Sequence, residues 1–249
     1  METAPSLLLM ATVLFTATLS GVFGMAGGMV LMGALLALLP VPQAMIAHGL
    51  LQFAANGARA VMLARHVRLR ILGFYAVGSA TAAILLQLVN IVPSTPWVYL
   101  TLGVMPLVAW LPTERVQLDA AKPGHAVACG ATVTGMHVAA GASGPLLDLF
   151  FARTTLDRHS IVATKAATQV LAHVIKIAFY LWLVRGTQQA ALPAWPWLLG
   201  GFALSLLGTW LGGKVLNRMS DKSFLQWTRW IITAIGAAYL LQALRLFWA

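Results

Sequence analysis

Two sets of polar and charged side chains stand at helical spacing in otherwise apolar stretches of the sequence. Within each set the members are separated by four, four and three residues, which places them in a stripe of roughly 80° on one face of a helix. The first set is His48, Gln52, Asn56 and Arg59, and the second is Lys165, Gln169, His173 and Lys176. A charge near the middle of a bilayer costs ~2.5–3.5 kcal/mol on insertion scales. We therefore expect both stripes to face the protein interior or water.

The stripe residues have a structural alternative to a role in function. Arg59 lies within two turns of a basic loop, and Lys165 lies about one turn from the start of its helix, so either side chain could extend to the membrane surface. The three amides of the stripes are also typical of hydrogen bonds between membrane helices. Lys176 and His173 lie deeper, and for these two a functional role is favoured.

Asp148 is the only acidic residue that we place inside a membrane segment. We interpret it as an ion-pair partner of Lys165 or Lys176, with proton transport as the alternative role. Even after this pairing the interior keeps more cationic than anionic groups, so the transported species is predicted to be a small anion. His137 could be either a local hydrogen-bonding residue or a substrate contact.

Two glycine-rich segments interrupt long apolar runs ahead of the stripes. The run from Leu7 to Leu39 has no charged residue and exceeds the ~20 residues that a helix needs to cross a bilayer, so we expect a break in it. Glycine tolerates unwound backbone, and a helix that starts anew turns free N–H groups and a partial positive charge toward a cavity. We predict an anion site between the two breaks at mid-membrane, lined by backbone at Gly24, Gly27, Gly28, Gly141, Ser143 and Gly144.

The apolar runs predict an all-α polytopic membrane protein with about eight hydrophobic segments. We expect helices at about 6–23, 27–39, 43–64, 71–91 and 97–111, and then at about 126–142, 144–152, 160–184, 196–216 and 224–247. The polar loop 112–125 separates two halves, approximately 6–111 and 125–247. The halves align without gaps at a shift of 117 residues, which matches the glycine breaks and the two stripes position by position. This coincidence indicates an internal duplication.

The composition is that of a membrane protein, since 60% of the 249 residues are hydrophobic and only 9% are charged. No polar stretch is long enough for a separate soluble domain, so 1–249 is expected to form a single membrane domain. The net charge of +10 is spread over loops and helix ends, which indicates orientation in a lipid bilayer and no binding of nucleic acid. The single cysteine, Cys129, excludes an intrachain disulfide, and no motif predicts a catalytic centre, a cofactor or a metal.

The topology depends on how the chain passes each break. Each half is expected to hold a glycine-broken helix, two transmembrane helices and a linking helix. If the broken segments are re-entrant hairpins, the loops 65–70, 112–125, 153–158 and 217–223 share one face, which then carries most of the Lys and Arg residues. If they are single crossings, the basic loops divide between both faces. The positive-inside rule favours the hairpins, with the basic face cytoplasmic and the halves inverted.

Three features of the sequence resemble the TauE/SafE sulfite exporter family. They are the glycine segments Gly24-Met25-Ala26-Gly27-Gly28 and Gly141-Ala142-Ser143-Gly144-Pro145, the run Ala163-Thr164-Lys165-Ala166-Ala167, and the arrangement in two halves. The resemblance covers nearly the whole chain. It implies a multi-pass transporter of the cell inner membrane that moves small sulfur oxyanions or organosulfonates, or other organic anions in some members.

The predicted function is that of a permease for a small anion such as sulfite or an organosulfonate, without a cofactor. One alternative is a membrane-embedded enzyme acting on a lipid or isoprenoid phosphate. Such an enzyme generally needs acidic metal ligands or a cluster of catalytic bases, and this interior offers one Asp. A passive anion channel is a second alternative. The sequence leaves the direction of transport, the coupling ion and the formation of a homo-oligomer open.

Overall fold

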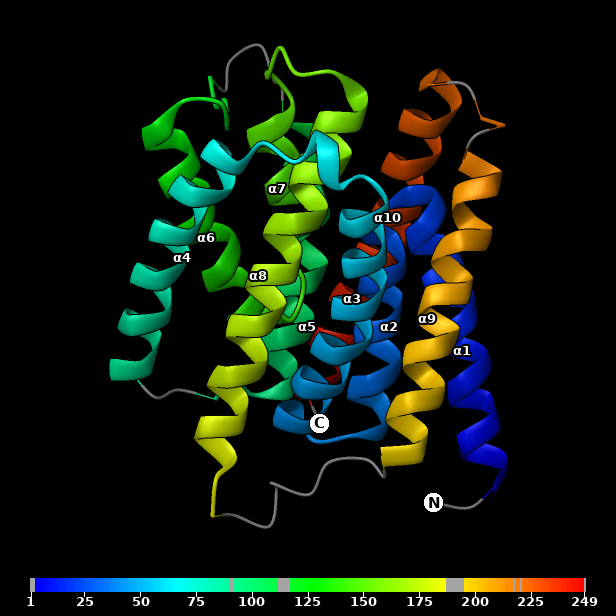
Figure 1. Ribbon diagram of the computed structural model, residues 1–249. Helices are drawn as coiled ribbons and strands as arrows, with labels where there is room; N and C mark the ends of the chain where they lie inside the picture. Colours follow the sequence, from blue (N-terminus) through cyan, green and yellow to red (C-terminus); the bar gives the residue numbers. More distant parts are fainter. Residues whose placement is uncertain are drawn as a thin grey trace.

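The computed structural model describes residues 3–89, 92–111, 117–186, 195–216, 218–219 and 221–248, and every regular element within these ranges is a helix. Figure 1 shows them as a single bundle. The α-helices are α1 (Thr3–Phe23), α2 (Met25–Leu38), α3 (Val41–Met62), α4 (Leu69–Val89), α5 (Thr95–Val104), α6 (Pro123–Ala140), α7 (Gly144–Phe151), α8 (Arg158–Val184), α9 (Trp195–Leu216) and α10 (Asp221–Trp248). Two short 3₁₀ helices are η1 (Ala64–His66) and η2 (Met105–Trp110). The prediction of an all-helical membrane protein is confirmed.

One predicted helix differs in kind from the observed element. The sequence predicted a continuous helix at 97–111, whereas α5 ends at Val104 and the chain continues as the 3₁₀ helix η2. Pro106 explains the change, because proline has no N–H to donate and its ring disfavours the preceding α-helical turn. The other predicted boundaries agree with the structure to within three residues.

Four of the described helices are long and apolar enough to cross a membrane by length and composition: α4, α8, and the Pro196–Leu216 and Gln226–Trp248 parts of α9 and α10. Shorter apolar helices are Leu7–Phe23, Met25–Leu38 and Thr95–Trp110. α3 is not among these helices, and three residues of its polar stripe, His48, Gln52 and Asn56, are buried inside the protein.

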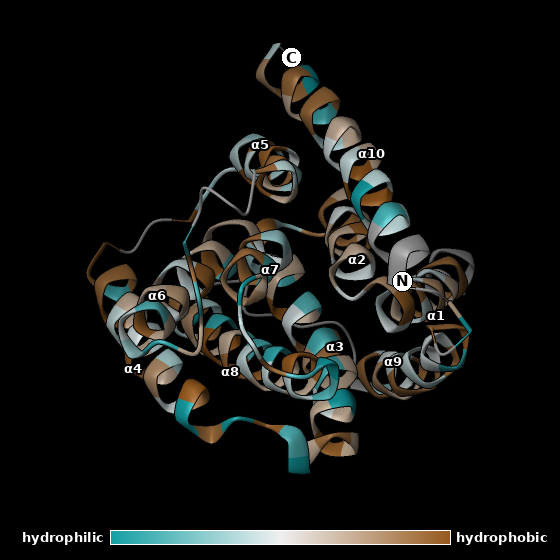
Figure 2. Ribbon diagram, turned by 90° about the horizontal axis from the view of Figure 1, so that it is seen from above, coloured by the Kyte–Doolittle hydropathy of each residue, from teal (hydrophilic) through white to brown (hydrophobic). Residues whose placement is uncertain are grey.

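Two pairs of parallel helices form the flanks of the molecule. On one side α1 packs along α9, and on the other α4 packs along α6 (Figure 2). Glycines permit both contacts, because a Cβ atom at Gly21 or Gly212 would meet the backbone of the partner helix, as it would at Gly78 or Gly130. Small residues that let helix backbones approach closely are typical of membrane bundles.

The centre of the bundle is formed by the two stripe helices, α3 and α8, which pack against each other (Figure 2). They run in opposite directions in Figure 1, and so do α5 and α10, which form a third contact at the side of the bundle. Two tyrosines connect this side to the first broken segment. Tyr239 of α10 donates to the Met29 carbonyl, and Tyr99 of α5 donates to the Gly33 carbonyl at 3.4 Å.

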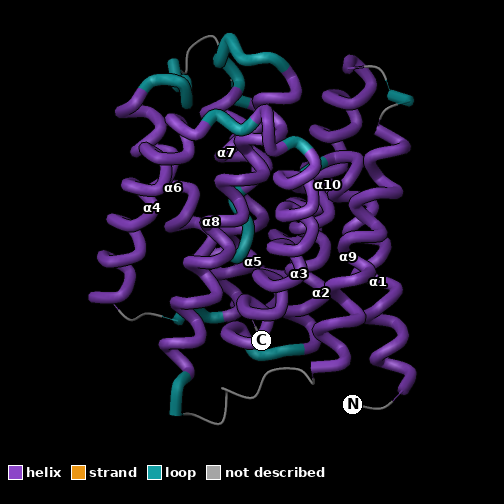
Figure 3. The backbone as a smooth tube through the Cα atoms, viewed as in Figure 1, coloured by secondary structure: helices purple, strands orange, loops and turns teal. Residues whose placement is uncertain are grey.

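Both glycine segments separate two helices, and the separating residue has a positive φ. Gly24 lies between α1 and α2 with φ 64°, and Gly141 follows α6 with φ 82°. A residue with a side chain rarely adopts this conformation, which explains glycine at both points. The chain reverses direction at each break (Figure 1), and the short loop between α6 and α7 lies at mid-height of the molecule (Figure 3). Most other loops gather at its two ends (Figure 3).

Candidate functional site

Two adjoining cavities lie where the broken segments meet the stripe helices. The smaller one, here called the inner pocket, has a volume of about 20 Å³. The larger one, here called the vestibule, has a volume of about 330 Å³. Both are lined by Gly24, Met25, Gly144 and Gln169, so these residues form the boundary between them.

The inner pocket brings together most of the site residues that the sequence predicted. From the glycine segments it is lined by Gly24, Gly28, Ser143 and Gly144. From the two stripes it is lined by His48, Gln52, Asn56, Gln169 and His173. Met25, His137 and Ala142 complete the lining. Residues from both halves of the sequence therefore enclose one small space.

Lys176 connects the two halves directly behind this pocket. Its side chain is fully buried, and its Nζ lies 2.8 Å from His48 Nδ1 and 3.0 Å from the Gly141 carbonyl. The Nε2 atom of His48 lies 2.9 Å from the Gly28 carbonyl. Because a carbonyl only accepts, Nε2 must carry the proton, and Nδ1 is left to accept from Lys176. One chain of hydrogen bonds thus links both glycine segments through both stripe helices.

One polar atom of the inner pocket has no partner among the described residues. His173 is buried, and its Nδ1 atom has no hydrogen-bond partner among the described residues. Its ring packs against His137 and His48, with ring centroids 4.7 Å and 5.7 Å away. His137 Nδ1 contacts the Ser143 hydroxyl and lies 3.1 Å from the Val133 carbonyl. An unpartnered polar atom in a buried pocket indicates a ligand or a water molecule that would form the missing hydrogen bond.

The first turns of α2 and α7 add further donors. No described side chain caps either helix start, although Gly24 and Ser143 stand at the capping positions and line the pocket. The N–H groups of a first helical turn lack partners within the helix, and the helix dipole gives this end a partial positive charge. The two starts touch, since a Cβ atom at Gly144 would overlap the side chain of Met25.

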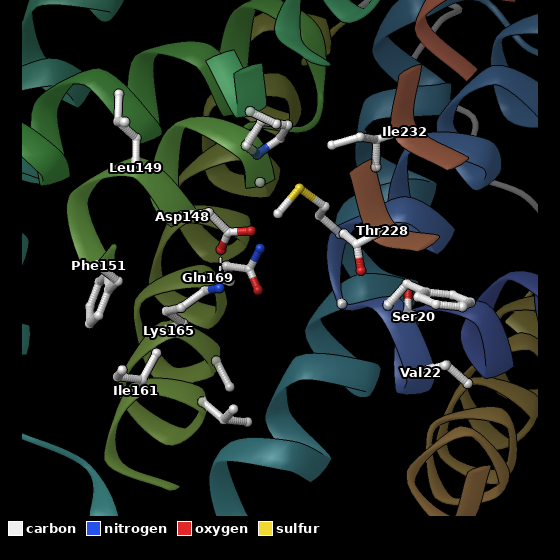
Figure 4. Close-up of a pocket in the computed structure, with 18 of the residues that line it drawn as sticks. Ser20, Val22, Asp148, Leu149, Phe151, Ile161, Lys165, Gln169, Thr228 and Ile232 are labelled. Carbon is white, nitrogen blue, oxygen red and sulfur yellow. Dashed lines mark hydrogen bonds and ion pairs between the residues drawn. The ribbon is translucent and has the colours of Figure 1, made fainter. Parts of the chain in front are cut away.

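The remaining charged stripe residues belong to the vestibule. Arg59 donates to the Ser20 carbonyl at 2.8 Å, and Lys165 forms an ion pair with Asp148. Figure 4 shows Asp148, Lys165 and Gln169 close together on one wall of this cavity, and Ser20, Thr228 and Ile232 on the opposite wall. Arg229 also lines the vestibule, so three cationic residues and one acidic residue surround it.

Three predicted site residues line neither cavity. Gly27 packs against the backbone of Thr16 and Ser20 in α1, where only a residue without a side chain fits. Gly141 and Lys176 lie one layer behind the inner pocket and act on it through His48. The role of these three residues in substrate binding stays a prediction.

The comparison with known families gives a clear result. A family model described as Sulfite exporter TauE/SafE matches residues 9–240, nearly the whole chain. The chain belongs to this family. TauE/SafE proteins are membrane transporters and not enzymes, which agrees with the transport function predicted from the residues. Searches of the curated proteins and of the solved structures returned no match.

Two residues of this TauE/SafE protein were missed as site candidates by sequence reasoning. Met25 stands at the boundary of the two cavities, and its position inside the first glycine segment was the available signal. Arg229 lies in α10, and nothing in the sequence relates it to the stripes. Among the described residues, no three His, Cys, Asp or Glu side chains are arranged to hold a metal ion.

Proposed function

We propose that this protein is an inner-membrane permease for a small sulfur oxyanion, and that the anion binds in the inner pocket between the two glycine breaks. The observation that carries the proposal is the buried His173 Nδ1 atom, which lines this pocket without a partner among the described residues. Two uncapped helix starts lie beside it. Lys176 lies behind the pocket, in contact with the lining residue His48. The two helix starts favour negative charge, and the unpartnered Nδ1 can donate to a bound oxyanion when it carries the ring proton.

The chemistry of the pocket favours an oxyanion over a cation or a neutral molecule. The described lining contains backbone N–H groups, imidazoles and amides, and it contains no carboxylate. A sulfite or sulfonate group presents three oxygen acceptors, which suits donors that converge from two helix starts and a histidine. The pocket of about 20 Å³ holds about one water, so an oxyanion requires it to widen. Movement of Met25 would join the pocket to the vestibule.

The arrangement of the helices supports an inverted internal duplication, which we include in the proposal. At the shift of 117 residues the end of α1 at Phe23 corresponds to the end of α6 at Ala140, and the start of α3 at Val41 corresponds to the start of α8 at Arg158. The helix contacts follow the same correspondence. α1 of the first half packs on α9 of the second half, and the equivalent helices α6 and α4 pack on each other. Transporters built from inverted repeats commonly bind substrate at the repeat interface near the membrane midplane.

The distribution of basic residues supports an orientation. The loops α3–α4 and α7–α8 and the adjoining ends of α9 and α10 lie at one end of the bundle (Figure 1). The basic residues in these described segments include Arg65, Arg68, Arg153, Arg158, Lys214 and Arg218. The positive-inside rule then makes this end cytoplasmic. The vestibule lies on this side, because it is lined by the first turns of α8.

The binding site is tested by anion-induced thermal stabilisation of the purified protein. Lys176 lies behind the inner pocket and acts on it through its hydrogen bond to His48, and a hydrogen bond from a charged donor contributes roughly 1.5–3 kcal/mol. Lys176→Met should therefore weaken anion binding about ten- to a hundredfold. Gly144→Leu should abolish binding, because even a Cβ atom there would overlap the Met25 side chain at the boundary of the inner pocket. Gln169→Leu should have a smaller effect than either. Wild-type affinity in both Lys176→Met and Gly144→Leu would place the site elsewhere.

Substrate and transport mode require flux measurements in proteoliposomes. A panel of sulfite, sulfate, sulfoacetate and thiosulfate should show saturable flux of at least one anion that competes with the others. Flux against the anion gradient, driven by a second ion, distinguishes a permease from a passive channel. Purely downhill flux under every imposed gradient would favour the channel.

A further inference from the structure

Lys176 is buried, and it has no acidic partner among the residues that the structure describes. Within this part of the chain its Nζ contacts His48 Nδ1 and the Gly141 carbonyl, and both acceptors are neutral. Of the six acidic residues in the sequence, Asp148 alone lies within an apolar stretch, and it is paired with Lys165. A buried ammonium without a nearby anion is strongly disfavoured, so the empty site favours the neutral amine.

The hydrogen bonds around Nζ agree with a neutral amine. An amine has two N–H groups, which match its two acceptors. An ammonium has three, and the third finds no acceptor among the described residues. His48 accepts from Lys176 and also lines the inner pocket, so it lies between the amine and a bound anion. The protonated form of Lys176 needs a nearby negative charge. An anion in the inner pocket would supply that charge.

We propose that the Lys176–His48 pair binds one proton for each anion that enters the inner pocket, which makes the protein a proton–anion symporter. The inference rests on the proposed anion site. The other titratable groups near Nζ are His173 of α8 and His137 of α6, whose rings pack together beside His48. Arg59, Lys165 and Asp148 line the vestibule instead. A proton on the pair thus meets no acidic group among the described neighbours until the anion arrives.

The positive charge of the proton bound at the Lys176–His48 pair is compensated by the negative charge of the bound anion. A hydronium ion breaks one O–H bond and leaves as water, its proton forms an N–H bond with the lone pair of Nζ, and Nδ1 of His48 can share that proton across the 2.8 Å hydrogen bond. No other bond forms or breaks, and the proton leaves with the anion on the opposite side. Each transport event therefore moves one negative charge fewer than the anion carries. Transport should respond to a pH gradient when the membrane potential is zero.

Proton uptake is measured by isothermal titration calorimetry of the full chain in two buffers that differ in ionisation enthalpy. Sulfate, thiosulfate and sulfoacetate serve as probes, because they carry no titratable proton near neutral pH. We expect uptake of about one proton per anion bound. Binding with about zero uptake would overturn the symport inference and leave the anion site standing. If none of the three binds, the symport inference fails, and the proposed function is judged by the flux panel that includes sulfite.

A pair of lysine variants tests the assignment to Lys176. In Lys176→Met the proton uptake should fall to about zero, measured at anion concentrations raised to offset the weaker binding. Lys122→Met is the matched control, because Lys122 is exposed at the start of α6, and it should keep an uptake of about one proton. Undiminished uptake in a folded Lys176→Met protein would overturn the assignment. If that variant does not fold, the wild-type proton count still decides whether a proton accompanies the anion.

Discussion

The ion pair between Asp148 and Lys165 stands at the edge of the vestibule, where both side chains are partly in contact with solvent. Their exposed fractions are 37% for Asp148 and 26% for Lys165. Water therefore screens the pair, and pairs of this kind contribute little to stability. Asp148 is also separated from Lys176, which lies behind the inner pocket. These positions assign Asp148 to the structure of the vestibule and leave proton binding to the deeper pair.

Removing the Asp148 charge should affect stability only slightly. We expect Asp148→Asn to lower the free energy of unfolding by about 1 kcal/mol or less, because an exposed ion pair contributes about 0–1 kcal/mol. The pH dependence of anion flux should stay as in the wild type. The measurement is proteoliposome flux at several pH values beside a denaturation curve. A folded Asp148→Asn protein that has lost its pH dependence would make Asp148 the proton carrier.

Asp157, at the end of the bundle that carries most of the basic loops, predicts a different response to pH. Its carboxylate accepts hydrogen bonds from the Ser160 hydroxyl at 2.6 Å and the Ser160 N–H at 3.0 Å, and it pairs with Arg68. Ser160 first, and then Arg68, hold the pKa of Asp157 well below its usual range. The folded state therefore binds this proton less readily than the unfolded state, and the stabilisation is fully present above about pH 4.

The Asp157→Ala variant should accordingly have a lower melting temperature than the wild type at neutral pH. The difference should shrink as the pH falls below about 4, because the wild-type carboxylate becomes protonated and loses its advantage. Thermal denaturation over this pH range measures it. A difference that stays constant down to the lowest pH would show that the charge of Asp157, the N-cap residue of α8, contributes nothing to stability.

At the scale of elements, the flanking helix pairs hold the broken segments in place. α1 carries the first break at its end, and its position is set by the close contact with α9. The glycines in this contact do not line either cavity, with the exception of Gly21. Packing along α1 and α9 thus positions the site without touching the anion.

Two neighbouring glycines of α9 provide a matched test of this packing. Gly212 faces the backbone of α1, whereas a Cβ atom at Gly213 would meet nothing within 4 Å. Gly212→Ala should lower the free energy of unfolding by about 1–3 kcal/mol through overpacking. Gly213→Ala should leave it unchanged or raise it by up to about 1 kcal/mol, because alanine is the better helix former. Denaturation by sodium dodecyl sulfate in mixed micelles measures both, and equal effects would contradict the close contact.

For the whole molecule, the reversals of direction at the two breaks decide which loops share a face. The start of α5 and the loop between α7 and α8 lie at opposite ends of the bundle (Figure 1). Ser94 and Thr155 are exposed in these two segments, and Cys129 is buried. These positions allow the proposed orientation to be measured directly.

Cysteines placed at Ser94 and Thr155 in a Cys129→Ala background should react with an impermeant maleimide from opposite sides of the membrane. Ser94→Cys should label in intact cells, and Thr155→Cys only in inverted vesicles. The reason is that the basic end of the bundle is expected to be cytoplasmic. Labelling of both cysteines from the periplasm would contradict the hairpin topology.

The sequence by itself determined the helices, the two stripes and the points where glycine interrupts the apolar runs. These are local properties, since helical periodicity follows from the spacing of side chains along one segment. The excess of interior cations over acids is also a property of composition, and it was sufficient to predict an anion. The resemblance to the TauE/SafE family came from the same short motifs, and the family model that matches residues 9–240 confirmed it.

Only the tertiary structure decided how the equivalent residues of the two stripes differ. Arg59 and Lys176 occupy matching positions in the halves, yet Arg59 reaches the vestibule and Lys176 is buried against His48 of the other stripe. Gly27 and Gly28 are adjacent in sequence, but one packs on α1 and the other lines the pocket. Periodicity states which face of a helix is polar, whereas the neighbour that this face meets depends on contacts between segments far apart in the chain. Those contacts arise from the packing of all the helices together, and no single segment encodes them.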